Sequence, residues 1–240
     1  MPGEAPAISV CMATCNGERF VRQQLDSILP QLGPHDEVIV SDDSSTDSTV
    51  ALVRSMADPR IVLLNGSFRS PVRNFENALG AARGERIFLA DQDDLWHPGK
   101  VAALMPLLER FNLVVSDCNL IDENGREIAP SFFAMRGSGP GVVKNVLKNG
   151  YLGCCMAFRR SVLDMALPFP ETIPMHDMWL GIVAEMAGRT HFLRNPLVCY
   201  RRHGANASPT GEKSSYTVLQ KIRFRYRLIC ALVGRVRSHE

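Results

Sequence analysis

The segment Asp91-Gln92-Asp93-Asp94 carries three carboxylates within four residues, directly after the apolar run 86–90. Carboxylates this close repel one another unless a cation lies between them. Mg²⁺ and Mn²⁺ prefer oxygen ligands, and commonly bind through one or two carboxylates together with substrate phosphates. A merely acidic loop is the alternative. The position between a predicted strand and Pro98, a helix-start signal, favours a ligand site, because α/β sheets bind ligands at strand ends.

A second polar segment, 41–49, follows the apolar residues 38–40. Asp42 stands where the predicted strand would end, and a carboxylate there can accept hydrogen bonds from a ribose hydroxyl or a base N–H. Asp43 is equally suited to organising the loop, and Asp47 to capping the next helix. The segment is therefore compatible with a ribose or base contact at Asp42, with structural roles for its two acidic neighbours.

The elements that must position these segments alternate between strand and helix patterns. Strands are expected at 7–13, 37–41, 60–64 and 86–90, and helices at 18–29, 47–57 and 71–82. This alternation is typical of βαβ units and a parallel sheet. Because right-handed crossovers place the strand ends on one edge, Thr14, Asp42 and the 91–94 segment should lie on the same edge of the sheet.

After Pro98 the pattern is less regular. Strands are expected at 112–117, 153–158, 191–193 and 197–200, helices at 142–148 and 176–187, a hairpin turn at 123–125 and a polar loop at 204–215. Residues 221–236 combine basic and apolar side chains at near-helical spacing. That helix would either lie on an anionic membrane surface or dock on the domain.

The composition limits the classes of function. The chain has 240 residues, enough for one large α/β domain, and its formal charge of +2 gives no indication of nucleic-acid binding. No apolar run is long enough to cross a bilayer, and the N-terminus lacks the pattern of a signal peptide. The seven cysteines are expected to be mostly reduced and buried, which suits the cytosol.

Several ordered segments together resemble the family 2 glycosyltransferases of the GT-A fold. They are 8–18, 40–47, 91–94, 153–160, 176–179 and 200–206, and the resemblance covers roughly residues 7–208. It implies a mixed, mainly parallel α/β sheet flanked by helices. The GT-A domain would span 1–215, with a nucleotide-sugar-binding half at 7–98 and an acceptor and catalytic half at 99–208. A basic amphipathic helix would follow at 216–240.

The resemblance also implies roles for individual residues, with a nucleoside-diphosphate sugar as donor and Mg²⁺ or Mn²⁺ as cofactor. Four residues would contact the nucleoside: Thr14, Asp42, Glu18 and Arg73. Asp93 and Asp91 would ligate the metal. His203 would contact the metal or the diphosphate, and its alternative is a polar lid residue. Asp94 would bind the donor sugar or support the loop.

Asp177 is the residue that the resemblance assigns as general base, taking the proton from the acceptor hydroxyl in an inverting displacement. A carboxylate at a helix start is also a common cap, which is the alternative for this residue. The preceding family position is usually glutamate, whereas this chain has His176.

We therefore expect a metal-dependent inverting glycosyltransferase that extends a polysaccharide or lipid-linked oligosaccharide in cell-envelope synthesis. The resemblance is greatest to rhamnosyltransferases, which makes dTDP-rhamnose one expected donor. The expected location is cytoplasmic, with peripheral contact to the inner face of the cell membrane if the basic helix binds an anionic surface. The alternatives are a nucleotidyltransferase and an inactive carbohydrate-binding scaffold protein. A phosphatase is disfavoured because the first strand ends in Thr14-Cys15-Asn16, without a nucleophilic aspartate.

Overall fold

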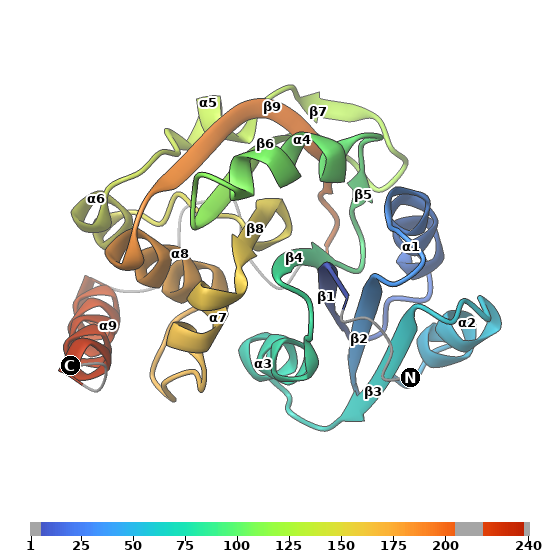
Figure 1. Ribbon diagram of the computed structural model, residues 1–240, viewed down its shortest axis with the longest axis horizontal. Coiled ribbons are helices and arrows are strands. Elements are labelled where there is room, and N and C mark those ends of the chain that lie inside the picture. The colour runs from blue at the N-terminus through green and yellow to red at the C-terminus, as the bar shows by residue number, and fades with distance from the viewer. Residues whose placement is uncertain (1–5, 205–217, 238–240) are drawn as a thin grey trace.

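The computed structural model describes residues 6–204 and 218–237, and contains a nine-stranded sheet with helices packed around it (Figure 1). The strands are β1 Ile8–Thr14, β2 Glu37–Asp43, β3 Ile61–Gly66, β4 Arg86–Asp91, β5 Leu95–Trp96, β6 Leu113–Ile121, β7 Glu127–Ala129, β8 Met156–Arg159 and β9 Thr190–Arg201. The α-helices are α1 Val21–Ile28, α2 Thr49–Ser55, α3 Pro71–Ala81, α4 Lys100–Leu108, α5 Phe132–Arg136, α6 Val142–Leu147, α7 Arg160–Ala166, α8 His176–Ala187 and α9 Val218–Arg237. Most of the polar loop expected at 204–215 lies outside the described residues.

The N-terminal half is the predicted parallel sheet, with neighbouring strands in the order β3-β2-β1-β4. Figure 1 shows α1 and α2 on one side of these strands and α3 on the other. Thr14 pairs in register with Asp42, and Ala13 with Asp91. Both acidic segments therefore lie on one edge of the sheet, as the crossover argument predicted.

The C-terminal half adds antiparallel strands, so the sheet is mixed. Strand β8 lies between β4 and β6 and runs antiparallel to both, whereas β6 and β9 are parallel. The expected hairpin joins β6 to β7, and Gly125 in its turn has φ of +82°, a conformation that glycine adopts without strain. This half therefore depends on long-range pairing more than on βαβ repetition.

Two predicted elements differ in the structure. The strands expected at 191–193 and 197–200 form one strand, β9, and Pro196 is accommodated because the pairing with β6 shifts register around Asp117. The strand expected at 153–158 begins only at Met156, after the 3₁₀ turn η2, Gly153–Cys155. The second irregularity lies at the candidate site, because Cys154 of η2 is grouped with Asp91 and Asp94.

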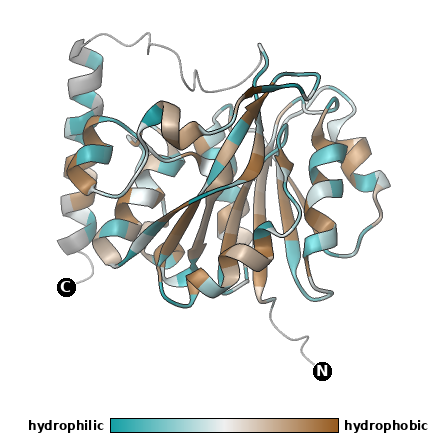
Figure 2. Ribbon diagram, turned by 90° about the horizontal axis from the view of Figure 1, so that it is seen from above, coloured by the Kyte–Doolittle hydropathy of each residue, from teal (hydrophilic) through white to brown (hydrophobic). Residues whose placement is uncertain are grey.

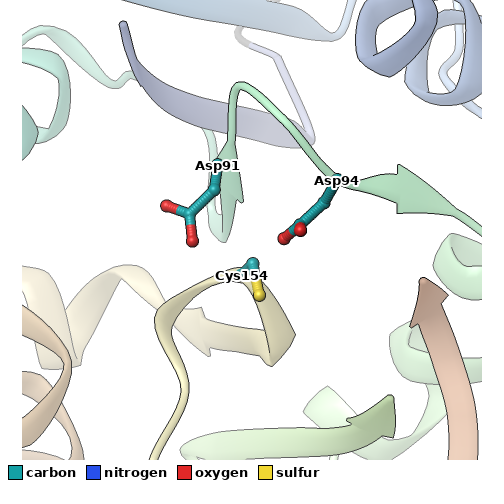
Figure 3. A group of neighbouring side chains, drawn as sticks. All are labelled: Asp91, Asp94 and Cys154. Atoms are coloured by element: carbon teal, nitrogen blue, oxygen red, sulfur yellow. The ribbon is translucent and has the colours of Figure 1, made fainter. Parts of the chain in front are cut away.

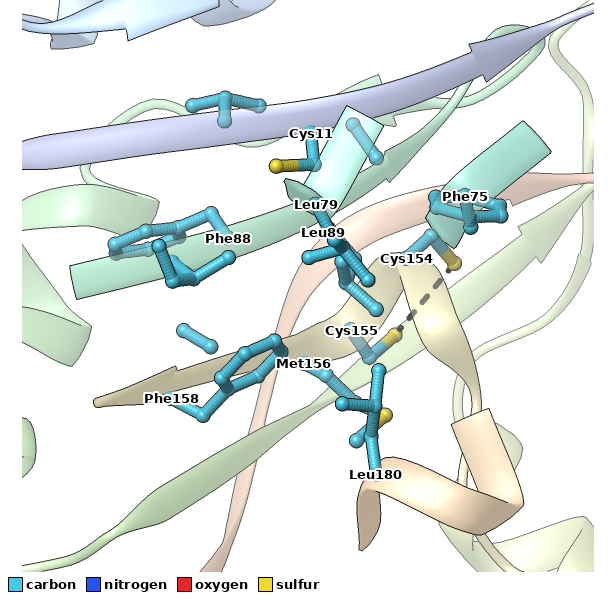
Figure 4. Close-up of a cluster of buried hydrophobic side chains, with 14 of the residues drawn as sticks. Cys11, Phe75, Leu79, Phe88, Leu89, Cys154, Cys155, Met156, Phe158 and Leu180 are labelled. Atoms are coloured by element: carbon cyan, nitrogen blue, oxygen red, sulfur yellow. Dashed lines mark hydrogen bonds between the residues drawn. The ribbon is translucent and has the colours of Figure 1, made fainter. Parts of the chain in front are cut away.

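The core lies between the sheet and its helices, and the strands are the most hydrophobic part of the chain (Figure 2). Figure 4 shows side chains of β1, β4 and β8 packed against Phe75 and Leu79 of α3 and Leu180 of α8. The buried cysteines are Cys11, Cys118, Cys154 and Cys155, all of them free thiols. Four of the seven cysteines are thus buried, and packing is the main role of the thiols at these positions.

Helix α9 docks on the domain. Leu228 and Leu232 are buried, and Arg225 donates hydrogen bonds to the carbonyl oxygens of Val146 and Leu147 at the end of α6. Arg235 donates in the same way to the carbonyl oxygens of Ala166, the last residue of α7, and of Leu167. None of the described helices is long and apolar enough to cross a membrane. Membrane contact stays a prediction for the exposed side of α9.

Candidate active site

Thr14 and Asp42 meet at the edge of the sheet, as predicted. The hydroxyl of Thr14 donates to Oδ2 of Asp42 at 2.9 Å, and Ser45 donates to the same carboxylate through its backbone N–H at 2.9 Å and its hydroxyl at 2.6 Å. Asp42 is buried, whereas the following loop is more open. The carboxylate is therefore fixed in place by its own loop.

Asp43 and Asp47 have the structural roles considered for them. Asp43 accepts backbone N–H groups of three residues: Phe68 at 2.5 Å, Arg69 at 3.0 Å and Ser70 at 3.1 Å. Burial alone raises the pKa of Asp43, but these bonds outweigh it and leave the pKa lowered. Asp47 accepts the backbone N–H of Thr49 at 3.0 Å, the first residue of α2, so it caps that helix start.

Glu18 and Arg73 are also held by protein contacts. Glu18 accepts the backbone N–H of Ser48 at 2.9 Å, which ties the β1–α1 loop to the start of α2. Arg73, on α3, pairs with Glu76 and donates to the carbonyl oxygen of Phe169 at 3.1 Å. Arg73 lines an open pocket of about 450 Å³, whose other lining residues are Ser67, Phe68, Glu76 and Asn77. Phe68, whose backbone N–H is held by Asp43, thus forms part of the wall of this pocket.

Asp91 and Asp94 turn their carboxylates toward the side chain of Cys154 on η2 (Figure 3). Oxygen and sulfur atoms of the three side chains lie within 4.8 Å of one another. Burial, followed by the charges of Asp93 and Asp177, raises the pKa of Asp91 to about 8. Burial and the neighbouring carboxylates also raise the pKa of Asp94. The cluster is short of positive charge.

Asp93 is paired with His203 across a long stretch of sequence. Nε2 of His203 lies 2.7 Å from Oδ2 of Asp93. Strand β9 makes this contact possible because it ends beside the acidic loop. There Arg201 donates its backbone N–H to Asp94 at 2.8 Å, and its Nε to the carbonyl oxygen of Asp93 at 2.7 Å. The predicted ligand His203 is thus placed at the acidic loop.

The residues of this cluster fit a divalent cation. Oδ2 of Asp94 is buried and has no hydrogen-bond partner among the described residues, which is costly for a carboxylate without a ligand. Its carboxylate oxygens and those of Asp91 are the ligands that Mg²⁺ and Mn²⁺ prefer. The predicted set was Asp91, Asp93 and His203, whereas the structure groups Asp91 with Asp94 and Cys154.

Lys100 is a buried cation that the sequence interpretation missed. It lies at the start of α4 and is 0% exposed, with Nζ donating to the carbonyl oxygen of Cys154 at 2.7 Å. Nζ also lies 4.0 Å from the centre of the Trp96 ring. Burial lowers the pKa of Lys100. Its only sequence signal is a lysine next to the apolar run 101–105 after the acidic loop. Its hydrogen bond to Cys154 stabilises the η2 turn.

Asp177 occupies the first turn of α8 and faces the acidic cluster closely enough to raise the pKa of Asp91. It is 7% exposed, and burial raises its own pKa to about 6. Its partners are the backbone N–H of Met178 at 2.6 Å and the side-chain amide of Asn149, 3.4 Å from both oxygens. Such a pKa suits a general base at neutral pH. Asn149 has no motif and was missed.

His176 is also buried, at 4% exposed, and its ring stacks on Phe75 with centroids 4.0 Å apart. Neither ring nitrogen has a hydrogen-bond partner among the described residues. Burial lowers the pKa of His176 to about 3, so the ring is neutral at physiological pH. The resemblance leads us to expect a glutamate at this position, and the neutral histidine adds no negative charge beside Asp177.

The mixed α/β sheet, with an acidic cluster and a buried carboxylate at one edge, is the arrangement expected of a GT-A glycosyltransferase. The profile of the Glycosyl transferase family 2 matches residues 9–166, and the chain belongs to this family.

Two relatives and two solved structures illustrate the similarity. The glucosyltransferase WfgD of Escherichia coli, which acts on α-D-GlcNAc-diphosphoundecaprenol, is 28% identical over 74% of this chain and 70% of its own. The dTDP-rhamnosyl transferase RfbG of Shigella flexneri is 26% identical over 90% of this chain and 80% of its own. TarS of S. aureus with UDP-GlcNAc superposes with a TM-score of 0.71 at 18% identity, covering 92% of this chain and 66% of that one. The mannosyltransferase PcManGT of Pyrobaculum calidifontis with GDP-Man and Mn²⁺ gives 0.62 at 22% identity, covering 99% and 65%. The chain thus spans less than two thirds of these solved chains, and they show the fold alone.

Proposed function

We propose that this chain transfers a sugar from a nucleoside-diphosphate donor to a glycan or lipid-linked acceptor, with inversion and with Mg²⁺ or Mn²⁺. The observation that carries the proposal is the position of Asp177, a buried carboxylate with a pKa of about 6 that faces the Asp91–Asp94 loop. Direct displacement requires a base for the acceptor hydroxyl close to the cation that neutralises the donor diphosphate. A nucleotidyltransferase or a scaffold protein does not need that base.

The residues divide the work between two sides of the site. Thr14 and Asp42 hold the nucleoside, and Asp91 and Asp94, with Asp93 and His203 beside them, hold the cation. When bound, the cation supplies charge neutralisation for the departing nucleoside diphosphate. Asp177 accepts the proton of the acceptor hydroxyl as its oxygen attacks the sugar. The Asn149 amide and the Met178 N–H keep the carboxylate oriented for that transfer.

The donor sugar is the finer part of the proposal. The two relatives above use UDP-glucose and dTDP-rhamnose by their names, at similar identities to this chain. Both nucleotides carry a pyrimidine base. We propose a pyrimidine nucleotide sugar as donor, and dTDP-rhamnose is the first candidate because the motifs of the chain resemble rhamnosyltransferases.

A donor panel tests the proposal directly. Hydrolysis of dTDP-rhamnose, UDP-glucose, UDP-GlcNAc and GDP-mannose is measured with Mn²⁺ and with a chelator, for the wild-type chain and for Asp93→Ala. We expect one pyrimidine donor to be cleaved only with the metal, and Asp93→Ala to lose metal-dependent binding of the nucleoside diphosphate while remaining folded. Unchanged Mn²⁺–nucleotide affinity in the variant would contradict the assignment of the acidic loop.

A further inference from the structure

Arg136 lies beside the proposed base, but it has no role in the transfer reaction proposed above. It is the last residue of α5 and is half-buried. Its Nε donates to the carbonyl oxygen of Asn149 at 2.9 Å, and the side chain of Asn149 contacts both oxygens of Asp177. One residue thus separates the guanidinium from the base, and its charge acts on the pKa of Asp177.

The guanidinium of Arg136 retains unused donors. Within the part of the chain that the structure describes, neither terminal nitrogen has a hydrogen-bond partner, and no carboxylate forms an ion pair with it. A paired arginine would use these donors structurally, as Arg225 and Arg235 do. A planar fork of free N–H groups matches the oxygens of a phosphoryl group.

The surrounding segment is basic as well. Residues 128–163 contain no aspartate or glutamate, but include Arg136, Lys144 and Lys148. Both lysines are exposed, Lys144 on α6 and Lys148 directly after the last residue of that helix. This part of the acceptor half therefore presents positive charge beside a base that would meet the acceptor hydroxyl.

Helix α6 also presents apolar surface next to this charge. Val143 is 72% exposed and Leu147 is 58% exposed, and their spacing places them on one face of the helix. Leu147 precedes Asn149 by only two residues. Two exposed aliphatic side chains at this spacing, beside lysines, form a surface for an apolar chain attached to an anionic group.

We propose that Arg136 binds a phosphoryl group joined to the acceptor sugar, and that α6 contacts an apolar chain attached to that group. The acceptor is therefore a glycan linked through phosphate to a lipid chain, rather than a free polysaccharide. The proposal rests on the glycosyl transfer proposed above, because it places the acceptor hydroxyl at Asp177.

Binding of three probes tests this assignment on the full chain. Farnesyl diphosphate has both parts, inorganic pyrophosphate has only the anion, and farnesol has only the chain. Calorimetry is carried out with EDTA, so that no diphosphate is drawn to the acidic cluster through a metal. We expect the wild-type chain to bind farnesyl diphosphate at least ten times more tightly than either of the other probes.

Matched variants assign the two parts. Arg136→Gln should weaken farnesyl diphosphate binding by about tenfold or more, whereas the exposed Arg110→Gln should leave it unchanged. Leu147→Gln should weaken farnesyl diphosphate and leave pyrophosphate unaffected. Arg136→Lys, which keeps the charge but not the fork, should give an intermediate affinity and serves if the glutamine variant does not fold.

Equal binding of farnesyl diphosphate by the wild-type chain and Arg136→Gln would overturn the phosphoryl assignment. Equal binding of pyrophosphate and farnesyl diphosphate by the wild-type chain would overturn the apolar half. Metal-dependent donor hydrolysis is measured in the same preparations. Retained hydrolysis together with failed probe binding rejects this inference alone, whereas lost hydrolysis in the wild-type chain rejects the proposed function.

Discussion

Two groups of carboxylates lie at the same edge of the sheet and differ in what supplies their hydrogen bonds. In the β2 loop, Asp43 and Asp47 accept several N–H groups of the protein, and the pKa of each is lowered although burial alone would raise it. In the second group, which comprises Asp91 and Asp94 of the acidic cluster and Asp177 facing them, burial raises the pKa of each carboxyl. The first group stabilises the fold as it stands. The second is complete only with a cation, a substrate or a proton.

The comparison shows how to distinguish structural from functional carboxylates when both stand in acidic motifs. Sequence composition is similar in the two loops, since each has aspartates directly after an apolar strand. What differs is the number of donors that the fold directs at each carboxylate. Substitutions should therefore have opposite effects on stability in the two groups, and effects on turnover in only one.

The largest effect is expected for Asp177→Asn. Turnover should fall by about two to four orders of magnitude, because the amide cannot accept the proton, while donor binding persists. The free energy of unfolding of the variant should rise, because the buried carboxylate destabilises the wild-type chain at neutral pH. A raised carboxyl pKa gives a penalty that is absent below about pH 3.8 and complete above about pH 6, where it is worth about 3 kcal/mol. Single-turnover kinetics and urea unfolding at pH 7.5 measure the two effects. Near-normal transfer would mean that another group is the base.

The matched change in the other group is Asp43→Ala. It leaves three backbone N–H groups without their acceptor, so the free energy of unfolding should fall by about 2–4 kcal/mol at pH 7. Because the pKa of Asp43 is lowered, its contribution is present above about pH 3.8 and is lost as the pH falls through the folded-state value. Urea unfolding at pH 7 and pH 3 measures this. A variant as stable as the wild-type chain would contradict the structural role.

Binding of a divalent cation should release a proton from the acidic cluster. With the pKa of Asp91 raised to about 8, the cation must displace a proton at neutral pH. Mn²⁺ affinity should therefore rise about tenfold per pH unit up to about pH 8 and level off above it. Calorimetry in two buffers of different ionisation enthalpy measures the released proton. Affinity that is independent of pH between 6 and 8 would show that the carboxylates are already ionised without the metal.

The smallest effect is expected for two arginines of α9, which also differ in whether the fold supplies hydrogen-bond partners. Arg225 donates to the last carbonyl oxygens of α6, whereas Arg223 is exposed. Arg225→Gln should lower the free energy of unfolding by about 1–2 kcal/mol, and Arg223→Gln by less than about 0.5 kcal/mol. Arg223→Gln should instead reduce co-sedimentation with anionic vesicles at low salt if the exposed side of α9 binds membranes. Equal stability losses in both variants would contradict the docking described for α9.

The sequence predicts which residues lie at the edge of the sheet, but it does not predict the buried contacts of the site. Periodicity locates β1, β2 and β4, and the crossover rule then brings Thr14, Asp42 and the 91–94 segment together. Asp177 and His203 were found through family resemblance, since no local pattern places a residue 110 positions away beside Asp93.

Asn149, Arg136 and Lys100 were missed for a physical reason. Each acts through a contact with a backbone carbonyl or a distant side chain, and such contacts leave no periodic signal. Strand β9 was divided at Pro196 because a proline normally ends a strand, and only the register shift against β6 lets it continue. Where the chain is irregular, the tertiary pairing decides the structure.

The pH dependence of transfer tests the central claim most directly. At saturating donor, acceptor and Mn²⁺, the single-turnover rate should rise tenfold per pH unit in acid and level off with a midpoint at or below about pH 6, because the nearby cation favours ionised Asp177. This acid limb should be absent from the residual activity of Asp177→Asn. The same limb in both proteins, or a flat profile in the wild-type chain down to pH 4, would contradict the assignment of Asp177 as the base.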